Sequence, residues 1–220
     1  MILMSITLSN SSLSLFLDCP RCFWLYKIKK ISRPAGAFPS LPSGMDRVLK
    51  EHFDSHRAKK TIPPELEGFN GTLYPDLEKL KIWRSNFKGL RYTDLSGATL
   101  MGALDDLFVT SADTYVPVDF KTRGFPLKQD THEHYQDQMN IYSLLLEKND
   151  LPPAGFAILL FYHPKKVNKN HNIEFHAEPV KIPTSPKNAL SLFTSALTCL
   201  QKEEPKPSKE CGYCNWEGAT

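Results

Sequence analysis

Residues 102–122 read GALDDLFVTSADTYVPVDFKT, a pattern typical of a β-hairpin. The run MGALDDLFV is apolar enough for one strand, SADT supplies turn residues, and YVPVDFK alternates between apolar and polar side chains. A hairpin centred near Ala112 places Asp105 opposite Asp119, because each of the two lies seven residues from the centre. Lys121 then shares their face of the hairpin, so that two carboxylates and an amine converge.

Carboxylates that face each other across a ladder repel, so this arrangement needs either solvent or a cation between the acids. A Mg²⁺ ion held by Asp105, Asp119 and the backbone carbonyl of Phe120 would activate a water molecule and neutralise charge on a scissile phosphate. Lys121 would orient the nucleophile or stabilise the pentavalent phosphorus. The alternative is an ordinary solvated hairpin face.

The segment 131–148 predicts a helix that follows the hairpin. Gln138 and Tyr142 lie four residues apart within it, so they share one helical face. In one interpretation Gln138 contacts the metal-bound water or a nucleic-acid backbone and Tyr142 supports it. In the other, Tyr142 is a core aromatic residue with Gln138 at the rim.

The composition indicates a globular protein, and the order of the expected helices and strands indicates a mixed α/β type. The 220 residues, 41% of them hydrophobic, suffice for one domain over 1–220, and the net charge of +3 permits an acidic partner without requiring one. No basic residue precedes Arg21 and no apolar run reaches membrane-spanning length, so we expect a cytoplasmic protein with no membrane partner. Neither a Rossmann nor a P-loop glycine pattern is present.

The remaining elements follow from periodicity and from breaker residues. A first helix should begin at Ser9 or Asn10 and break or restart at Pro20. GFAILLFYHP predicts a buried central strand with NIEFHAEPVKI as its more polar neighbour, and Ser185 should cap a final helix. Further expectations are an irregular connector over 33–44, helices over 45–60 and near 74–87, a loop over the IPPEL and GFNG segments, and strands from Arg91 onward.

Four of the five cysteines form two C-x-x-C pairs, CPRC at Cys19 and Cys22 and CGYC at Cys211 and Cys214. In a reducing compartment such pairs indicate one four-coordinate metal site, the alternative being four unligated thiols. Cys199 fits a small buried hydrophobic position in the last helix. The seven histidines show no metal-binding motif and are expected to be ordinary surface or helix-start residues.

Three motifs in this order resemble the RecB-like branch of the PD-(D/E)XK nuclease superfamily, which includes CRISPR-associated and AddB-type nucleases. GALD is similar to its Gly-x-x-Asp strand, VDFK to its Asp-x-Lys strand and QMNIY to its Gln-x-x-x-Tyr helix. SNSSLSLFLDCPRCFWL resembles its Ser-rich first helix leading to Cys-Pro, so the resemblance spans nearly the whole chain. It implies an α/β, restriction-endonuclease-like core, with a central mixed β-sheet flanked by helices, in which the Cys₄ site joins the two terminal segments.

The resemblance also implies a further metal ligand upstream, which is a histidine in the family. PSGMDRVLKEHFD offers Asp46 at that place, with Glu51 and His52 as alternatives. Asp46 would otherwise be a first-turn acid that stabilises a helix N-terminus. Iron–sulfur members have one N-terminal and three C-terminal cysteines, and Thr220 stands where the third would fall. Both a [4Fe–4S] cluster and Zn²⁺ therefore stay open, with the resemblance favouring the cluster.

The expected function is hydrolysis of phosphodiester bonds in single- or double-stranded DNA by a Mg²⁺- or Mn²⁺-dependent nuclease. DNA repair, recombination or related DNA processing is compatible with such a family, and a helicase or other DNA-processing protein is a compatible partner. One alternative is an inactive nucleic-acid-binding or scaffold module of the same fold. Another is an iron–sulfur redox-responsive protein in which the cluster itself is the function.

Overall fold

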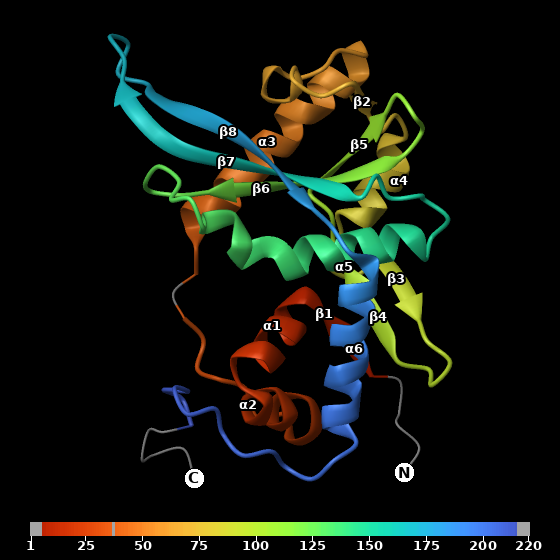
Figure 1. Cartoon of the computed structure of the whole chain (residues 1–220). Coiled ribbons are helices and arrows are strands. Elements are labelled where there is room, and N and C mark those ends of the chain that lie inside the picture. The colour runs from red at the N-terminus through yellow and green to blue at the C-terminus, as the bar shows by residue number, and fades with distance from the viewer. Residues whose placement is uncertain (1–5, 37, 215–220) are drawn as a thin grey trace.

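Two β-sheets form the centre of the protein (Figure 1), as seen in a computed structural model that describes residues 6–36 and 38–214. The larger sheet has the order β2-β5-β6-β7-β8, with β6 and β7 parallel and the other neighbours antiparallel. Its strands are β2 (Gly71–Leu73), β5 (Asp106–Thr110), β6 (Tyr115–Thr122), β7 (Phe156–Val167) and β8 (Ile173–Pro183). The smaller sheet has the order β1-β4-β3, from β1 (Thr7–Ser9), β3 (Leu90–Thr93) and β4 (Thr99–Gly102).

Helices pack against both faces of the larger sheet. The α-helices are α1 (Asn10–Asp18), α2 (Pro20–Trp24), α3 (Ser40–Lys59), α4 (Leu77–Trp83), α5 (Gln136–Glu147) and α6 (Pro186–Leu200). A π-helical turn, η1 (Leu25–Lys29), follows α2, and short 3-10 turns occupy η2 (Pro64–Leu66) and η3 (Thr131–Tyr135). Among the described residues, no helix is both long enough and apolar enough to cross a bilayer. This mixed sheet between helices confirms the fold class expected from the sequence.

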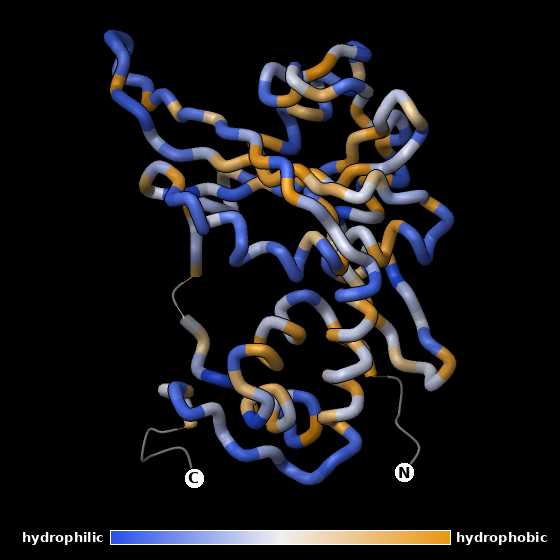
Figure 2. The backbone as a smooth tube through the Cα atoms, in the orientation of Figure 1, coloured by the Kyte–Doolittle hydropathy of each residue, from blue (hydrophilic) through white to orange (hydrophobic). Residues whose placement is uncertain are grey.

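The alternation of strand side chains divides the core into two clusters. Leu159 and Phe161 of β7 pack in one cluster with α5, whereas Ile158 and Leu160 of the same strand pack in the other with Phe53 of α3. Strand β7 is therefore buried on both faces, as predicted for GFAILLFYHP. In Figure 2 the apolar backbone segments gather at this centre, and the loop that joins β7 to β8 is largely hydrophilic.

The prediction of one strand over MGALDDLFV is wrong. Strand β4 ends at Gly102 in the smaller sheet, and β5 starts at Asp106 in the larger sheet. Gly102 passes so close to α5 that an added Cβ would lie 2.8 Å from the Leu145 Cδ1 atom. The Leu104 N–H then donates to the Trp83 carbonyl oxygen at 3.0 Å. The chain thus changes sheets here, and Asp105 lies just before the paired part of the β5–β6 hairpin.

Two further boundaries differ from expectation. Helix α3 starts at Ser40 rather than near 45, because Pro42 is tolerated in a first turn, where its missing N–H would have no partner. Asp46 therefore lies beyond the first turn, and its interpretation as a first-turn acid is wrong. The segment expected as a loop contains β2, which pairs with β5.

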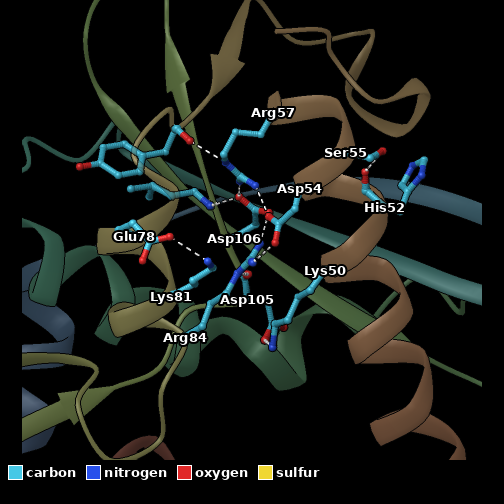
Figure 3. Close-up of polar contacts among 12 residues, drawn as sticks. Lys50, His52, Asp54, Ser55, Arg57, Glu78, Lys81, Arg84, Asp105 and Asp106 are labelled. Carbon is cyan, nitrogen blue, oxygen red and sulfur yellow. Dashed lines mark hydrogen bonds and ion pairs between the residues drawn. The ribbon is translucent and has the colours of Figure 1, made fainter. Parts of the chain in front are cut away.

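A buried ionic network joins α3, the end of α4 and the start of β5 (Figure 3). Asp106 is fully buried and forms ion pairs with Arg57 and Arg84, both of which also pair with Asp54. Arg57 additionally donates from Nε to the Tyr74 carbonyl oxygen at 2.6 Å. These contacts satisfy charges that would otherwise be very unfavourable inside the protein.

Replacing Asp106 with asparagine should destabilise the protein, because Arg57 and Arg84 would keep their charges without the buried carboxylate. Breaking a buried pair in this way costs roughly 3–5 kcal/mol. Urea unfolding followed by circular dichroism should show a lower midpoint for Asp106→Asn. The matched control, Asp113→Asn in the exposed turn between β5 and β6, should unfold like the wild type. Equal midpoints for all three proteins would contradict the importance of the network.

Candidate active site and cysteine cluster

The hairpin register places the two predicted acids side by side. Asp106 pairs with Val118, and continuing this register brings Asp105 opposite Asp119. The backbone N–H of Phe120 donates to Asp105 Oδ2 at 2.9 Å, which fixes the carboxylate against β6. The structure thus confirms the predicted proximity of the acids, although Asp105 itself lies outside the ladder.

A connected set of polar contacts links Asp119 to helix α5. Lys121 Nζ lies 2.6 Å from Asp119 Oδ2 and donates to Gln138 Oε1 at 2.9 Å. Gln138 Nε2 in turn contacts Asp119 Oδ1 at 3.0 Å and Tyr142 Oη at 2.8 Å. Gln138 therefore touches both charged groups and holds them in a fixed relation. Tyr142 is buried in the apolar core and its hydroxyl contacts the partly exposed Gln138, as the interpretation of a core aromatic residue beside a rim residue expects. The contact of Gln138 with a metal-bound water or a nucleic-acid backbone stays a prediction.

Helix α3 adds two more charged side chains to the group. Lys50 Nζ lies 2.7 Å from Asp46 and 3.1 Å from Asp105 (Figure 3 shows Lys50 beside Asp105). Burial disfavours the charge on Lys50, but Asp105 and Asp46 raise its pKa above the ordinary value, so it stays cationic. Sequence reasoning missed Lys50, although its i, i+4 spacing from Asp46 on a predicted helix was a usable signal.

The two alternatives to Asp46 contact other partners. Glu51 is exposed and pairs with Arg47 at 3.1 Å. His52 Nε2 lies 3.3 Å from Glu65 Oε2. The structure therefore brings Asp46, but neither Glu51 nor His52, into the group around Asp105.

The donor set suits a hard divalent cation, because it offers carboxylate oxygens in a partly buried place. Asp119 is 1% exposed, and its Oδ2 lies 2.6 Å from the Lys121 ammonium. Burial, together with the negative charge of Asp105, raises the pKa of Asp119 to about 7. A bound cation would stabilise a buried carboxylate whose ionised form is disfavoured in this way. We call Asp46, Lys50, Asp105, Asp119, Lys121 and Gln138 the acidic cluster.

The four paired cysteines lie together at the other end of the molecule. Cys19 and Cys22 stand at the start of α2, and the C-terminal segment returns to them with Cys211 and Cys214 (Figure 1). All four sulfurs lie within 4.8 Å of one another. Cys199 lies apart from them in α6, partly buried against the main core.

The surroundings favour the thiolate at Cys19, whereas burial raises the pKa of Cys22 and of Cys214. Burial alone would raise the pKa of Cys19, but hydrogen bonds that involve the backbone of Cys22 and Ser208 outweigh it and lower this pKa to about 6. Arg33 Nη2 lies 3.4 Å from Cys211 Sγ, so a guanidinium group stands beside the sulfurs. Four sulfur donors at this spacing and with this charge balance can hold a thiophilic metal ion.

A family model described as the PD-(D/E)XK nuclease superfamily matches residues 41–219. No curated protein matches the sequence. Among solved structures, the chain resembles one entitled "Crystal structure of SSO0001" at 16% identity and a TM-score of 0.47, over 97% of this chain and 85% of that chain. The match to the family model includes the whole acidic cluster and most of the sequence, and the chain therefore belongs to the PD-(D/E)XK nuclease superfamily.

Proposed function

We propose that the protein is a divalent-metal-dependent DNA nuclease of the RecB-like branch. The observation that carries this proposal is the close grouping of Asp105, Asp119 and Lys121, held together through Gln138. Its substrate would be single- or double-stranded DNA, whose backbone presents the phosphodiester that such a group can attack. A role in DNA repair or recombination, alongside a helicase or other DNA-processing protein, is compatible with this activity.

Asp105, Asp119 and the Phe120 carbonyl would hold Mg²⁺ or Mn²⁺, with Asp46 as a further ligand. The bound ion would supply positive charge beside the scissile phosphate and lower the pKa of a water molecule. Lys121 would orient the attacking water and stabilise negative charge on the phosphate. Gln138 keeps the Lys121 ammonium pointed at this place, because it accepts a hydrogen bond from Nζ while donating to Asp119.

The role of Lys50 would depend on whether a metal ion is bound by the neighbouring carboxylates. Its ammonium now compensates the charges of Asp46 and Asp105. A cation bound by those carboxylates would take over this compensation, and Lys50 would then be available to contact a substrate phosphate. The negative charges of Asp46 and Asp105 would thus be compensated both without the metal ion, by Lys50, and with it, by the ion.

Lys121→Met should abolish cleavage, because it removes the ammonium while keeping most of the side-chain volume. We expect a rate at least ~10²-fold below that of the wild type in a gel assay with labelled DNA and Mg²⁺ or Mn²⁺. Lys187→Met, an exposed lysine on α6, is the matched control and should cleave normally. Equal cleavage by Lys121→Met would rule out the assigned role, and a wild type that binds DNA without cutting it under any dication would indicate the inactive binding module.

Asp119→Asn should stabilise the metal-free protein, increasingly so as the pH rises. The folded-state pKa of Asp119, about 7, exceeds the ordinary value of 3.8, so ionisation costs folding free energy. The wild type therefore loses stability as the pH rises from 3.8 through about 7, and the asparagine variant lacks this loss. In EDTA, the melting temperature of Asp119→Asn should exceed that of the wild type by more at pH 8 than at pH 5.

Mn²⁺ added at pH 8 should then raise the melting temperature of the wild type more than that of Asp119→Asn. Asp113→Asn, in the exposed hairpin turn, serves as the control and should follow the wild type in both series. A stability difference independent of pH and of Mn²⁺ would contradict the assignment of Asp119 as a buried ligand.

For the cysteine cluster we propose a single Zn²⁺ ion rather than the [4Fe–4S] cluster that the family resemblance favours. A tetrahedral ion with Zn–S bonds of about 2.3 Å sets its sulfurs about 3.8 Å apart. The sulfur of Cys214 lies 3.3 Å from that of Cys22 and 3.8 Å from that of Cys19. In a [4Fe–4S] cluster each thiolate binds a different iron, so the sulfurs stand much further apart.

Within this proposal, the ion joins the N-terminal helix pair to the C-terminal segment and completes one domain over 1–220. It would close a loop of 195 residues between Cys19 and Cys214, which constrains the unfolded chain strongly. The same two segments also meet through the Arg21–Glu204 ion pair at 2.6 Å and through Trp24 Nε1, which donates to the Lys202 carbonyl oxygen at 3.1 Å.

Elemental analysis of anaerobically purified protein should find one zinc per chain and no iron. Cys22→Ser should lose the zinc and melt at a lower temperature, whereas Cys199→Ser, the control, should keep it. About four irons per chain, with the broad visible absorption of a cluster, would contradict the zinc assignment and reopen the redox-responsive alternative.

A further inference from the structure

A second group of metal-ligating side chains lies on the β7–β8 hairpin, away from the cysteines. His163 of β7 pairs directly with His176 of β8, and their rings are 5.2 Å apart. Glu178 follows on the same face of β8, because strand side chains alternate. One donor atom from each of the three lies within 4.8 Å of the others. We call these three residues the His-Glu group.

A hydrogen bond of the His163 ring leaves one of its nitrogens free to bind a metal ion. Its Nδ1 lies 3.2 Å from the Pro164 carbonyl oxygen, and the residue is 8% exposed. A carbonyl oxygen can only accept, so this contact places the proton on Nδ1 and leaves the Nε2 lone pair free. Metal-binding histidines usually donate their second N–H to a carbonyl or carboxylate in this way.

The other two members lack competing partners. Within the described residues, the Glu178 carboxylate has no hydrogen bond or ion pair, and the contact of the His176 side chain is with the ring of His163. Glu174, on the same strand, instead pairs with Lys165 at 3.3 Å and with Lys166 at 3.5 Å. The carboxylate beside the histidines is thus the one left unpaired, although lysines occur nearby in the hairpin.

The register also gives the group a defined place in the fold. Phe161 pairs with Lys121 across the parallel β6–β7 ladder, and His163 lies two residues further along on the same face. Directly after His163, the β7–β8 register shifts between Pro164 and Lys166. The His-Glu group therefore lies directly before the irregularity in the β7–β8 ladder, and two further pairs, Lys166 with Glu174 and Val167 with Ile173, follow that irregularity. Figure 1 shows that this end of the hairpin projects from the rest of the sheet.

We propose that His163, His176 and Glu178 bind a first-row transition-metal dication, with Zn²⁺ as the preferred ion. Two imidazoles and one carboxylate form a nitrogen and oxygen set that suits Zn²⁺, whereas Mg²⁺ and Ca²⁺ prefer oxygen ligands alone. Three protein ligands leave one coordination position open to water or an anion. The ion would clamp β7 to β8 at the point where the ladder loses its regular register. This inference is independent of the proposed nuclease activity.

The test is a binding count with Zn²⁺ on the full chain, with the cysteine cluster first loaded with zinc. Excess Mg²⁺ is present to fill the acidic cluster, since Mg²⁺ competes poorly for imidazole. Equilibrium dialysis should find one more Zn²⁺ per chain for the wild type than for His176→Gln. That residue is exposed, so its replacement should leave the fold intact. His134→Gln, an exposed histidine outside the group, is the control and should bind as the wild type does.

Hydrogen–deuterium exchange provides a second test, because Zn²⁺ would not alter amide exchange around a histidine that has only a structural role. Zn²⁺ should slow amide exchange in β7 and β8 around the His-Glu group in the wild type and in His134→Gln, and should have no effect in His176→Gln. Equal zinc counts in all three proteins, or exchange in the wild type that does not respond to Zn²⁺, would overturn the proposal.

Discussion

The buried carboxylate of Asp106 is the interaction on which the rest of the architecture depends. Asp106 is fully buried and its partners Arg57 and Arg84 are largely buried, so that no member can lose its partner without a large cost in folding free energy. Arg84 also donates to the Asp105 carbonyl oxygen at 2.8 Å. Two adjacent acids therefore have different roles: Asp106 fixes α3 and the end of α4 to β5, and Asp105 is held at the acidic cluster. Because one peptide bond joins Asp105 to Asp106, the contacts that stabilise the fold also fix the position of Asp105 in the acidic cluster.

Charge balance explains how the acidic cluster can exist inside a folded protein. Asp46, Asp105 and Asp119 bring three carboxylates together, against the two ammonium groups of Lys50 and Lys121. Asp119 is the most buried of the three acids, and burial together with the negative charge of Asp105 disfavours its ionised form and raises its pKa. Such a site favours a cation more strongly than an exposed pair of acids would, because the surrounding protein screens the charges less than water does.

The sequence predicts those features that depend on local rules. The hairpin centre follows from turn residues and strand alternation, the pairing of Gln138 with Tyr142 from helical spacing, and the cysteine pairs from their own short motifs. Prediction from the sequence fails for contacts that depend on segments far apart in the chain. The buried ion pairs of Asp106 were not predicted, because they depend on arginines in two other elements. The His-Glu group was missed for the same reason: its members become neighbours only through the β7–β8 register.

The cysteine cluster has a consequence for the order in which the protein is made. Cys19 and Cys22 leave the ribosome early, while Cys214 is synthesised 195 residues after Cys19. During translation the first two thiols are therefore exposed to oxidants and to stray metal ions, without the partners that will later enclose them. The four sulfurs can therefore come together only late in biogenesis, after the segment that carries Cys214 has emerged.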